Sequence, residues 1–239
     1  MTTPSDTKFP PGGIAVVIGA TGGIGAALFA ALQRNAGFQA TTGFSRNSDP
    51  RLDLTDESSI ARCAAQIQAQ PRPLRLVIDA TGTLHDHNQQ PEKSWLQIDA
   101  GAMAQSFAIN AIGPALLMKH FLPLLARDGR AVFATLSAKV GSIGDNHLGG
   151  WYSYRASKAA LNQLVHTAAI ELRRRAPEAL CVALHPGTVA TPLSAPFSKT
   201  GLKIVTPQEA AQRLLTVIEG LDANANGGFY SHDGTVLPW

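Results

Sequence analysis

Short apolar runs alternate with longer segments of helical periodicity along most of the chain. Runs rich in β-branched or aliphatic residues predict strands at residues 14–18, 39–44, 74–80, 130–136, 179–184 and 228–231. Between them, apolar residues recur at helical spacing over residues 22–35, 56–70, 100–127, 152–174 and 207–221. Strands alternating with helices of this length predict βαβ units and a mostly parallel sheet covered on both faces.

Local signals mark where some of these elements begin. Thr55 is a candidate N-cap for the helix at 56–70, and Pro114 predicts a kink or a new helix start near residues 110–113. The least regular stretches, 141–151 and 186–206, both follow predicted strands. Ligands of open α/β sheets bind at the carboxyl ends of strands, so we expect the functional site there.

Composition narrows the class of protein. The chain has 239 residues, of which 45% are hydrophobic, and we expect a single domain over 1–239 with residues 1–10 as a flexible tail. The net charge is +3, but the dense basic run Arg173–Arg175 falls at a predicted helix end, where it complements the helix dipole. No basic stripe with interleaved aromatic residues is present, which argues against nucleic-acid binding.

Other patterns exclude a membrane span and a metal centre. We find no signal peptide and no apolar run of about 18 residues. Cys63 and Cys181 lie far apart without a ligand-spaced partner, which is typical of a reduced, cytoplasmic chain. His85 and His87 form an H-x-H pair without a third ligand at useful spacing, so we interpret them as polar loop residues.

A glycine-rich turn follows the first strand and opens the first helix: Gly19-Ala20-Thr21-Gly22-Gly23-Ile24-Gly25. A helix N-terminus presents unpaired N–H groups and partial positive charge, and glycines leave room for a phosphate to approach. A plain tight turn is the alternative. The preceding strand, the following helix and the later Asp53 favour dinucleotide binding.

The end of the second strand bears on the choice of dinucleotide. NAD enzymes place an acid there for the ribose 2′-OH, whereas this strand ends in Gly43-Phe44-Ser45-Arg46. A guanidinium can hold a 2′-phosphate bidentately, and Ser45 can donate to it. The pattern favours NADP, and an ordinary surface position for Arg46 is the alternative.

Tyr154 and Lys158 lie one turn apart on one face of a predicted helix. A phenol is a poor acid–base catalyst near neutrality, but a nearby ammonium favours phenolate and lowers its pKa. Tyr152 has Ala156 one turn on and therefore no lysine in register. The spacing alone also fits an ordinary amphipathic pair.

Taken together, these motifs resemble the short-chain dehydrogenase/reductase family, from about residue 14 to the end of the chain. The resemblance rests on motifs whose order and separations match the family's: Gly19, Gly23 and Gly25, Asp53-Leu54 after a further strand, Asn110, Ser137, Tyr154 with Lys158, and Pro186-Gly187 with Thr191. Residues 150–162 and Leu237-Pro238-Trp239 resemble the C-factor-type subgroup. The resemblance implies a Rossmann-like, doubly wound α/β sheet of about seven strands.

The resemblance also implies roles for particular residues. Tyr154 would be the acid or base, Lys158 would lower its pKa and bind the nicotinamide ribose, and Ser137 would hydrogen-bond the substrate carbonyl. Asn110 would hold the helix geometry and a relay water. The remaining residues are expected at the cofactor: Gly19, Thr21, Gly22, Gly23, Ile24, Gly25, Ser45, Arg46, Asp53, Leu54, Ala80, Thr81, Gly82, Pro186, Gly187, Val189 and Thr191.

Two positions depart from the family's pattern. Asp79-Ala80-Thr81-Gly82 stands where the family often has Asn-Asn-Ala-Gly, and Thr81 is a candidate replacement for the lost polar contact. Ile18 stands where the family has Thr before the first glycine.

We therefore predict an NADP-dependent oxidoreductase that transfers a hydride between NADP(H) and a small carbonyl or secondary-alcohol compound. Two alternatives stay open: a nucleotide-binding signalling or sensor protein without turnover, and an NAD-preferring dehydrogenase. The resemblance also implies a homodimer or homotetramer, because the family's long central helices usually pair between subunits.

Overall fold

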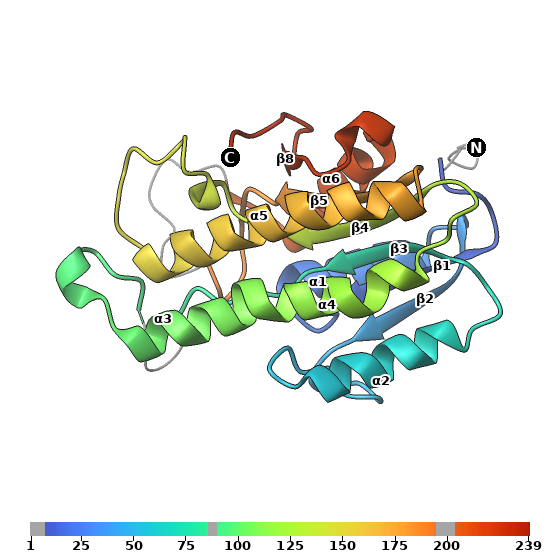
Figure 1. Ribbon diagram of the computed structural model, residues 1–239, viewed down its shortest axis with the longest axis horizontal. Helices are drawn as coiled ribbons and strands as arrows, with labels where there is room; N and C mark the ends of the chain where they lie inside the picture. Colours follow the sequence, from blue (N-terminus) through green and yellow to red (C-terminus); the bar gives the residue numbers. More distant parts are fainter. Residues whose placement is uncertain (1–7, 86–89, 195–203) are drawn as a thin grey trace.

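A parallel sheet forms the centre of the computed structural model, which describes residues 8–85, 90–194 and 204–239 (Figure 1). Its strand order is β2-β1-β3-β4-β5-β8, with every neighbouring pair parallel. The strands are β1 (Gly13–Ile18), β2 (Phe38–Phe44), β3 (Leu74–Asp79), β4 (Ala131–Leu136), β5 (Ala179–His185) and β8 (Phe229–Ser231). β1, β3 and β4 are buried at every residue, as expected for parallel strands covered on both faces.

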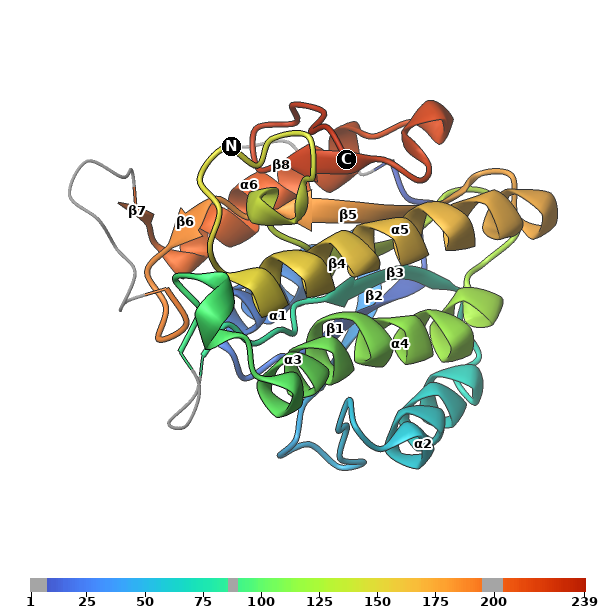
Figure 2. The same ribbon diagram turned by 60° about the vertical axis from the view of Figure 1, so that its left-hand side comes forward.

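Helices cover the two faces in separate layers. The main helices are α1 (Gly23–Gln33), α2 (Glu57–Gln68), α3 (Ala100–Phe107), α4 (Gly113–Phe121), α5 (Tyr152–Arg175) and α6 (Pro207–Gly220). α2, α4 and α5 pack with one set of strand side chains, including Ile14, Val16 and Phe133, and α1 and α6 pack with the other, including Val17 and Leu180. Figure 2 shows α2, α4 and α5 together in front of the sheet. The doubly wound α/β prediction is confirmed.

The strand order determines which edge of the sheet is suited to bind a ligand. From β1 the chain steps outward to β2 on one side and then crosses to β3, β4, β5 and β8 on the other. The carboxyl ends of β1 and β3 therefore flank the point where the winding reverses, which is where such sheets bind ligands. A separate pair, β6 (Thr188–Val189) with β7 (Ile204–Val205), follows β5.

Some local predictions differ from the structure. Asp56 caps α2 by accepting from the Ser58 N–H, whereas the predicted cap, Thr55, bonds the Asp53 carboxylate. Residues 51–53 form no strand, so Asp53 follows a loop. Phe9 lies in the predicted tail, yet it is buried against Phe38, so the expected tail does not extend to this residue. Residues 1–7 lie outside the described chain.

The irregularity predicted near residues 110–113 is a π-helical segment. α3 continues into η2 (Ala108–Ile112), a π-helical segment, and then into α4 with Pro114 in its first turn. Pro114 has no N–H to continue an α-helical ladder, and a π-bulge inside a helix often marks a functional residue. Asn110 sits inside this segment and is fully buried.

Helical residues Ala100–Leu124 are, by length and composition, long and apolar enough to cross a membrane. The sequence analysis did not anticipate such a segment. In the structure this segment belongs to the layer that covers the sheet: α3 packs on α5, and α4 packs on α2 and α5. Packing against the sheet explains its composition.

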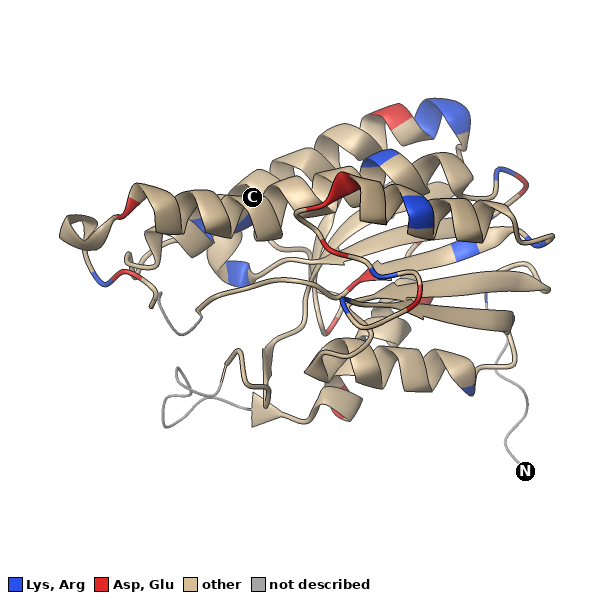
Figure 3. Ribbon diagram, turned by 90° about the horizontal axis from the view of Figure 1, so that it is seen from below, with Lys and Arg blue, Asp and Glu red and all other residues tan. Residues whose placement is uncertain are grey.

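Charged residues are sparse over the described ribbon (Figure 3). The run Arg173–Arg175 occupies the last turn of α5, as predicted, where it complements the negative end of the helix dipole. The densest basic cluster of the sequence therefore has a structural role at a helix end.

Candidate active site

The glycine-rich turn joins β1 to α1 with little room to spare. Gly19 has φ +82°, which favours glycine, and a Cβ on Gly25 would collide with the Gly19 carbonyl oxygen. Gly22 is the N-cap of α1 and makes no side-chain cap, while Thr21, Gly22 and Gly23 are exposed. The uncapped N–H groups of the first turn therefore face an accessible cradle suited to an anion.

Two distant segments border this cradle. A Cβ on Gly19 would lie 3.1 Å from the Ala80 carbonyl oxygen, and one on Gly23 would lie 2.8 Å from Thr191 Cγ2. The first turn, the end of β3 and the segment after β5 thus meet at one edge of the sheet. The sequence predicted all three as cofactor-binding segments, and the structure brings them together.

The end of β2 presents an exposed cation. Arg46 is exposed, whereas Ser45 is buried and accepts the Asn47 N–H at 3.1 Å. The Asp53 carboxylate accepts from Thr55 and pairs with Arg51 at 2.7 Å; the Thr55 hydrogen bonds lower the pKa of Asp53.

Leu54 lies against the start of α4, where a Cβ on Gly113 would come 2.7 Å from its Cβ. Gly113 therefore allows the close approach of the loop that carries Asp53 and Leu54 to the covering helices.

Asn110 ties the π-helical segment to the segment after β3. Its Nδ2 donates to the Thr83 carbonyl and its Oδ1 accepts the Thr83 N–H, both at 2.8 Å. Nδ2 also lies 3.2 Å from Ser157 Oγ on α5. Asn110 thereby fixes the position of the loop after Gly82 relative to the helix that carries Tyr154.

Lys158 points from α5 into the same edge of the sheet. Its side chain is buried, and Nζ donates to the Leu136 carbonyl at 2.8 Å. A Cβ on Gly82 would lie 3.4 Å from Nζ and 3.3 Å from Asn110 Oδ1, so the glycine allows both side chains to approach this turn. Tyr154, one turn earlier on the helix, is partly buried, and no hydrogen bond of its hydroxyl to another described residue is found.

Ser137 follows β4 and is held by α5. Its Oγ donates to Asn162 Oδ1 at 2.6 Å, and both residues are buried. Tyr154, Lys158 and Asn162 recur at one-turn intervals on one face of α5, and the last two contact the residues at the end of β4. The sequence analysis missed Asn162, although its helical spacing from Lys158 was visible.

Burial dominates the electrostatics of the pair. Burial raises the pKa of Tyr154 to about 12 and lowers the pKa of Lys158 to about 8, with Asp79 opposing the change at Lys158. The expectation that Lys158 lowers the phenol pKa is therefore not met in the protein as described. Desolvation alone raises the pKa of Tyr154, and Lys158 Nζ donates to the Leu136 carbonyl.

Two acids near the site are buried: Glu92, which the sequence did not single out, and Asp79, which the sequence marked only as a departure from the family's pattern. Glu92 accepts hydrogen bonds from the N–H and hydroxyl of Ser153, and its own carbonyl accepts the Trp151 N–H at 2.5 Å. It therefore anchors the N-terminus of α5. Asp79 accepts from Thr81, so the departure at Thr81 serves this carboxylate.

Not all of the residues expected at the cofactor after β5 can place a side chain at the site. Pro186 and Gly187 directly follow β5. Gly187 has φ +77°, and a Cβ there would lie only 2.5 Å from the His232 ring. The Val189 side chain is buried with Val205 and Ala210, so only its backbone can border a ligand. Burial lowers the pKa of His185 to about 4.

Among the described residues no group of three metal-ligating side chains occurs. The His85 Nε2 instead lies 3.1 Å from the Leu193 carbonyl, linking the loop after β3 to the segment after β5. His87 lies outside the described residues.

Comparisons with known proteins agree with this architecture. The family model described as enoyl-(acyl carrier protein) reductase matches residues 20–220. A 1-hydroxy-2-glutathionyl-2-methyl-3-butene dehydrogenase of Rhodococcus sp. (strain AD45) is 32% identical over 195 residues, covering 80% of each chain. The C-signal of Myxococcus xanthus is 36% identical over 143 residues, which cover 59% of this chain and 81% of the relative.

Solved structures share the whole fold. NADPH-bound carbonyl reductase from chicken fatty liver superposes with a TM-score of 0.84 at 25% identity, covering 99% of this chain and 97% of the other. The carbonyl reductase Sniffer of D. melanogaster, at 24% identity and a TM-score of 0.82, covers 96% and 100%. With the glycine turn, the buried lysine and the strand order in place, this chain belongs to the short-chain dehydrogenase/reductase family of oxidoreductases.

Proposed function

We propose that this protein is an NADP-dependent reductase or dehydrogenase that acts on a small carbonyl compound or secondary alcohol. The observation that carries the proposal is that Lys158 and Ser137 meet at the sheet edge where the glycine turn opens, with Tyr154 one helical turn from Lys158 on the same helix. NADP(H), when bound, would supply or accept the hydride. The protein would supply orientation, proton transfer and stabilisation of charge on the substrate oxygen.

The residues present fit such a cofactor. The cradle of Gly19, Gly23 and Gly25 has no Cβ to fill it, and the N-terminus of α1 is uncapped, which suits a pyrophosphate. Arg46 is exposed at the end of β2, and its guanidinium suits a 2′-phosphate. The NADPH bound by the chicken carbonyl reductase supports the choice of NADP.

Each catalytic side chain has a chemical task. Tyr154 donates a proton to the substrate oxygen during reduction and accepts it during oxidation. Lys158, fixed by the Leu136 carbonyl, has N–H groups left for a ribose hydroxyl. Ser137, oriented by Asn162, hydrogen-bonds the substrate oxygen, and Asn110 holds the loop that borders the site.

Replacement of Tyr154 by Phe tests the proposal. The phenol is the proposed proton donor, so kcat for NADPH consumption with a panel of small aldehydes and ketones should fall about 10²- to 10⁴-fold. NADPH affinity, measured by fluorescence titration, should stay within a factor of about three, because the ring remains. A variant with full turnover would exclude Tyr154 as the acid.

Signalling is the second candidate function, favoured by the similarity to the protein named C-signal. In that case the fold binds the nucleotide without relevant turnover. Tyr154→Phe separates the two functions: full biological activity with normal NADPH binding would support signalling and contradict the enzymatic role.

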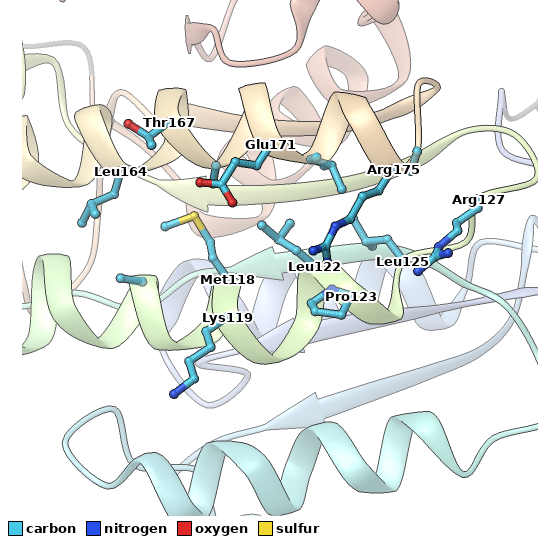
Figure 4. Close-up of a pocket in the computed structure, with 14 residues that line it drawn as sticks. Met118, Lys119, Leu122, Pro123, Leu125, Arg127, Leu164, Thr167, Glu171 and Arg175 are labelled. Carbon is cyan, nitrogen blue, oxygen red and sulfur yellow. The ribbon is translucent and has the colours of Figure 1, made fainter.

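We also propose that the protein forms a homodimer or homotetramer through α4 and α5. A groove of about 360 Å³ runs between these helices, with Met118, Leu122 and Leu164 along it and Glu171 pointing into it, while Lys119 points toward α2 (Figure 4). Partly buried apolar side chains along an open groove suit pairing with a second copy about a twofold axis.

A further inference from the structure

A short turn after β3 brings together Asp79, Lys158 and Asn110. Asp79 is the last residue of β3 and bonds Thr81, whereas Asn110 bonds Thr83. Lys158 Nζ and Asn110 Oδ1 approach the intervening Gly82. One turn of backbone is therefore contacted by a carboxylate, an ammonium and an amide from three different elements.

Asp79 is a carboxylate enclosed by donors. It has no exposed surface, and Oδ1 accepts from the Thr81 N–H at 3.0 Å and from the Thr81 hydroxyl at 2.5 Å. Oδ2 accepts from the Thr135 hydroxyl at 2.6 Å. Hydrogen bonds donated to a carboxylate favour its charged form, although burial alone raises the pKa of Asp79.

Lys158 carries a buried ammonium that needs a balancing negative charge. It is 3% exposed, and Leu136, the residue after Thr135, provides its backbone acceptor. A neutral carbonyl does not balance a buried positive charge. Asp79 stands across the Thr81–Gly82 turn from Nζ: its carboxylate holds Thr81, and Nζ approaches Gly82, without a direct ion pair between the two groups. Across this turn Asp79 holds the pKa of Lys158 up against burial.

We propose that Asp79 is the counter-ion of Lys158, a positioning residue that keeps the ammonium charged and directed at the turn after β3. The juxtaposition joins two groups that burial pushes toward their neutral forms, and each charge stabilises the other. An acid serves this purpose where the family often has an amide. The role accounts for a carboxylate in a fully buried position.

Among the described residues, few charged groups face Asp79 and Lys158. Ile18 on β1 and Thr135 on β4 flank Asp79 in register and do not titrate, and Asn110 is neutral. α5 adds Tyr154. η4 (Lys139–Gly141) packs on Lys158 through Gly141 and carries Lys139, which pairs with Asp145 at 3.4 Å.

Removal of the Asp79 charge should lower the pKa of Lys158. Asp79 holds the pKa of Lys158 up against burial, so removal of its charge should let that pKa fall below about 8. Asp79→Asn is a conservative test, because an amide oxygen can still accept from Thr81 and an amide N–H can donate to the Thr135 hydroxyl. Charge is lost while the shape and the hydrogen-bond positions remain.

The experiment is an NMR titration of the cofactor-free protein with ¹³C-labelled lysine side chains, in which Lys158→Met identifies the Lys158 resonance. We expect the Lys158 midpoint to fall by about one to two pH units in Asp79→Asn. An unchanged or raised midpoint would overturn the proposal. Should D79N not fold, the Asp79 carboxyl resonance is titrated in wild type and in Lys158→Met, where the Asp79 pKa should rise; no change would overturn the proposal equally.

Two matched variants separate charge from geometry. Thr135→Val removes one donor from Asp79 but leaves its charge, so the Lys158 midpoint should move less than in Asp79→Asn. A shift as large as that of D79N would assign the effect to geometry and overturn the counter-ion role. Asp128→Asn removes an acid paired with Arg75 and should leave the Lys158 midpoint in place.

A consequence for binding rests on the proposed function. If Lys158 binds the cofactor as an ammonium, NADPH affinity in Asp79→Asn should decline at lower pH than in wild type. A shifted NMR midpoint without this shift in binding would support the counter-ion and count against the proposed role of Lys158. The two proposals can therefore fail separately.

Discussion

At the scale of single residues, Arg46 is the side chain on which cofactor choice should depend. It is exposed at the end of β2, beside a buried Ser45. A guanidinium that holds a 2′-phosphate makes charge-assisted hydrogen bonds that dinucleotides lacking this group cannot receive. The same argument predicts an unequal effect of its removal on the two nicotinamide cofactors.

Arg46→Ala should weaken NADPH binding about 10- to 100-fold and leave NADH binding nearly unchanged, measured by fluorescence titration. Arg62→Ala is the control, because Arg62 is exposed on α2 and pairs with Asp56. Equal losses for both cofactors in Arg46→Ala would remove the 2′-phosphate role and favour the NAD-preferring alternative.

Asn162 carries a second prediction at this scale. It accepts the Ser137 hydroxyl at 2.6 Å and so sets the direction of that oxygen. Asn162→Ala should lower kcat/KM about tenfold through loss of one hydrogen bond, with NADPH affinity preserved. Gln163→Ala changes the exposed neighbour, which bonds Thr167, and should keep wild-type kinetics. Equal effects of the two substitutions would contradict the positioning role.

At the scale of elements, the turn between β1 and α1 depends on the absence of side chains. A Cβ on Gly25 meets the Gly19 carbonyl oxygen, so Gly25→Ala must open the turn. We expect NADPH affinity to fall more than about tenfold and the free energy of unfolding to fall by about 1–3 kcal/mol, measured by fluorescence titration and urea denaturation.

Gly220 provides the matched control for this substitution. It ends α6, and a Cβ there meets nothing within 4 Å. Gly220→Ala should leave NADPH binding intact and change the free energy of unfolding by less than about 1 kcal/mol. If Gly25→Ala behaved like Gly220→Ala, the tight turn would not be required for binding.

The helices and strands themselves were largely predictable, because apolar periodicity is a local property of the chain. β1, β3, β4, α5 and α6 match the predicted ranges closely. The cap of α2 was misplaced because Thr55 and Asp56 are both good caps, and the choice depends on the loop: Thr55 bonds Asp53. Pro114 predicted an irregularity, but its π-helical form reflects the packing around Asn110.

At the scale of the whole molecule, the groove between α4 and α5 bears on assembly. Leu164 lies on α5 within this groove, away from the residues of the active site. Leu164→Arg places a charge against the apolar groove and should convert the proposed oligomer to monomers in sedimentation velocity, while the fold is kept. Leu148→Arg alters an exposed leucine elsewhere and should leave assembly unchanged. A monomeric wild-type protein would contradict the proposed interface.

The sequence by itself determined the α/β class, the glycine turn, the Tyr154–Lys158 spacing and the absence of an acid after β2. Each of these depends on residues close together in the chain, where periodicity and steric demand can be read directly. Their order along the chain then sufficed for the family resemblance, which the comparisons bear out.

Only the tertiary structure decided which groups share the buried edge of the sheet. The pairings of Asp79 with Thr135, Asn110 with Thr83 and Glu92 with Ser153 join residues far apart in sequence. They depend on strand register and on how α5 crosses the sheet, which no local pattern records. Burial at that edge also sets the pKa values, because desolvation is a property of the packed molecule and not of the motif.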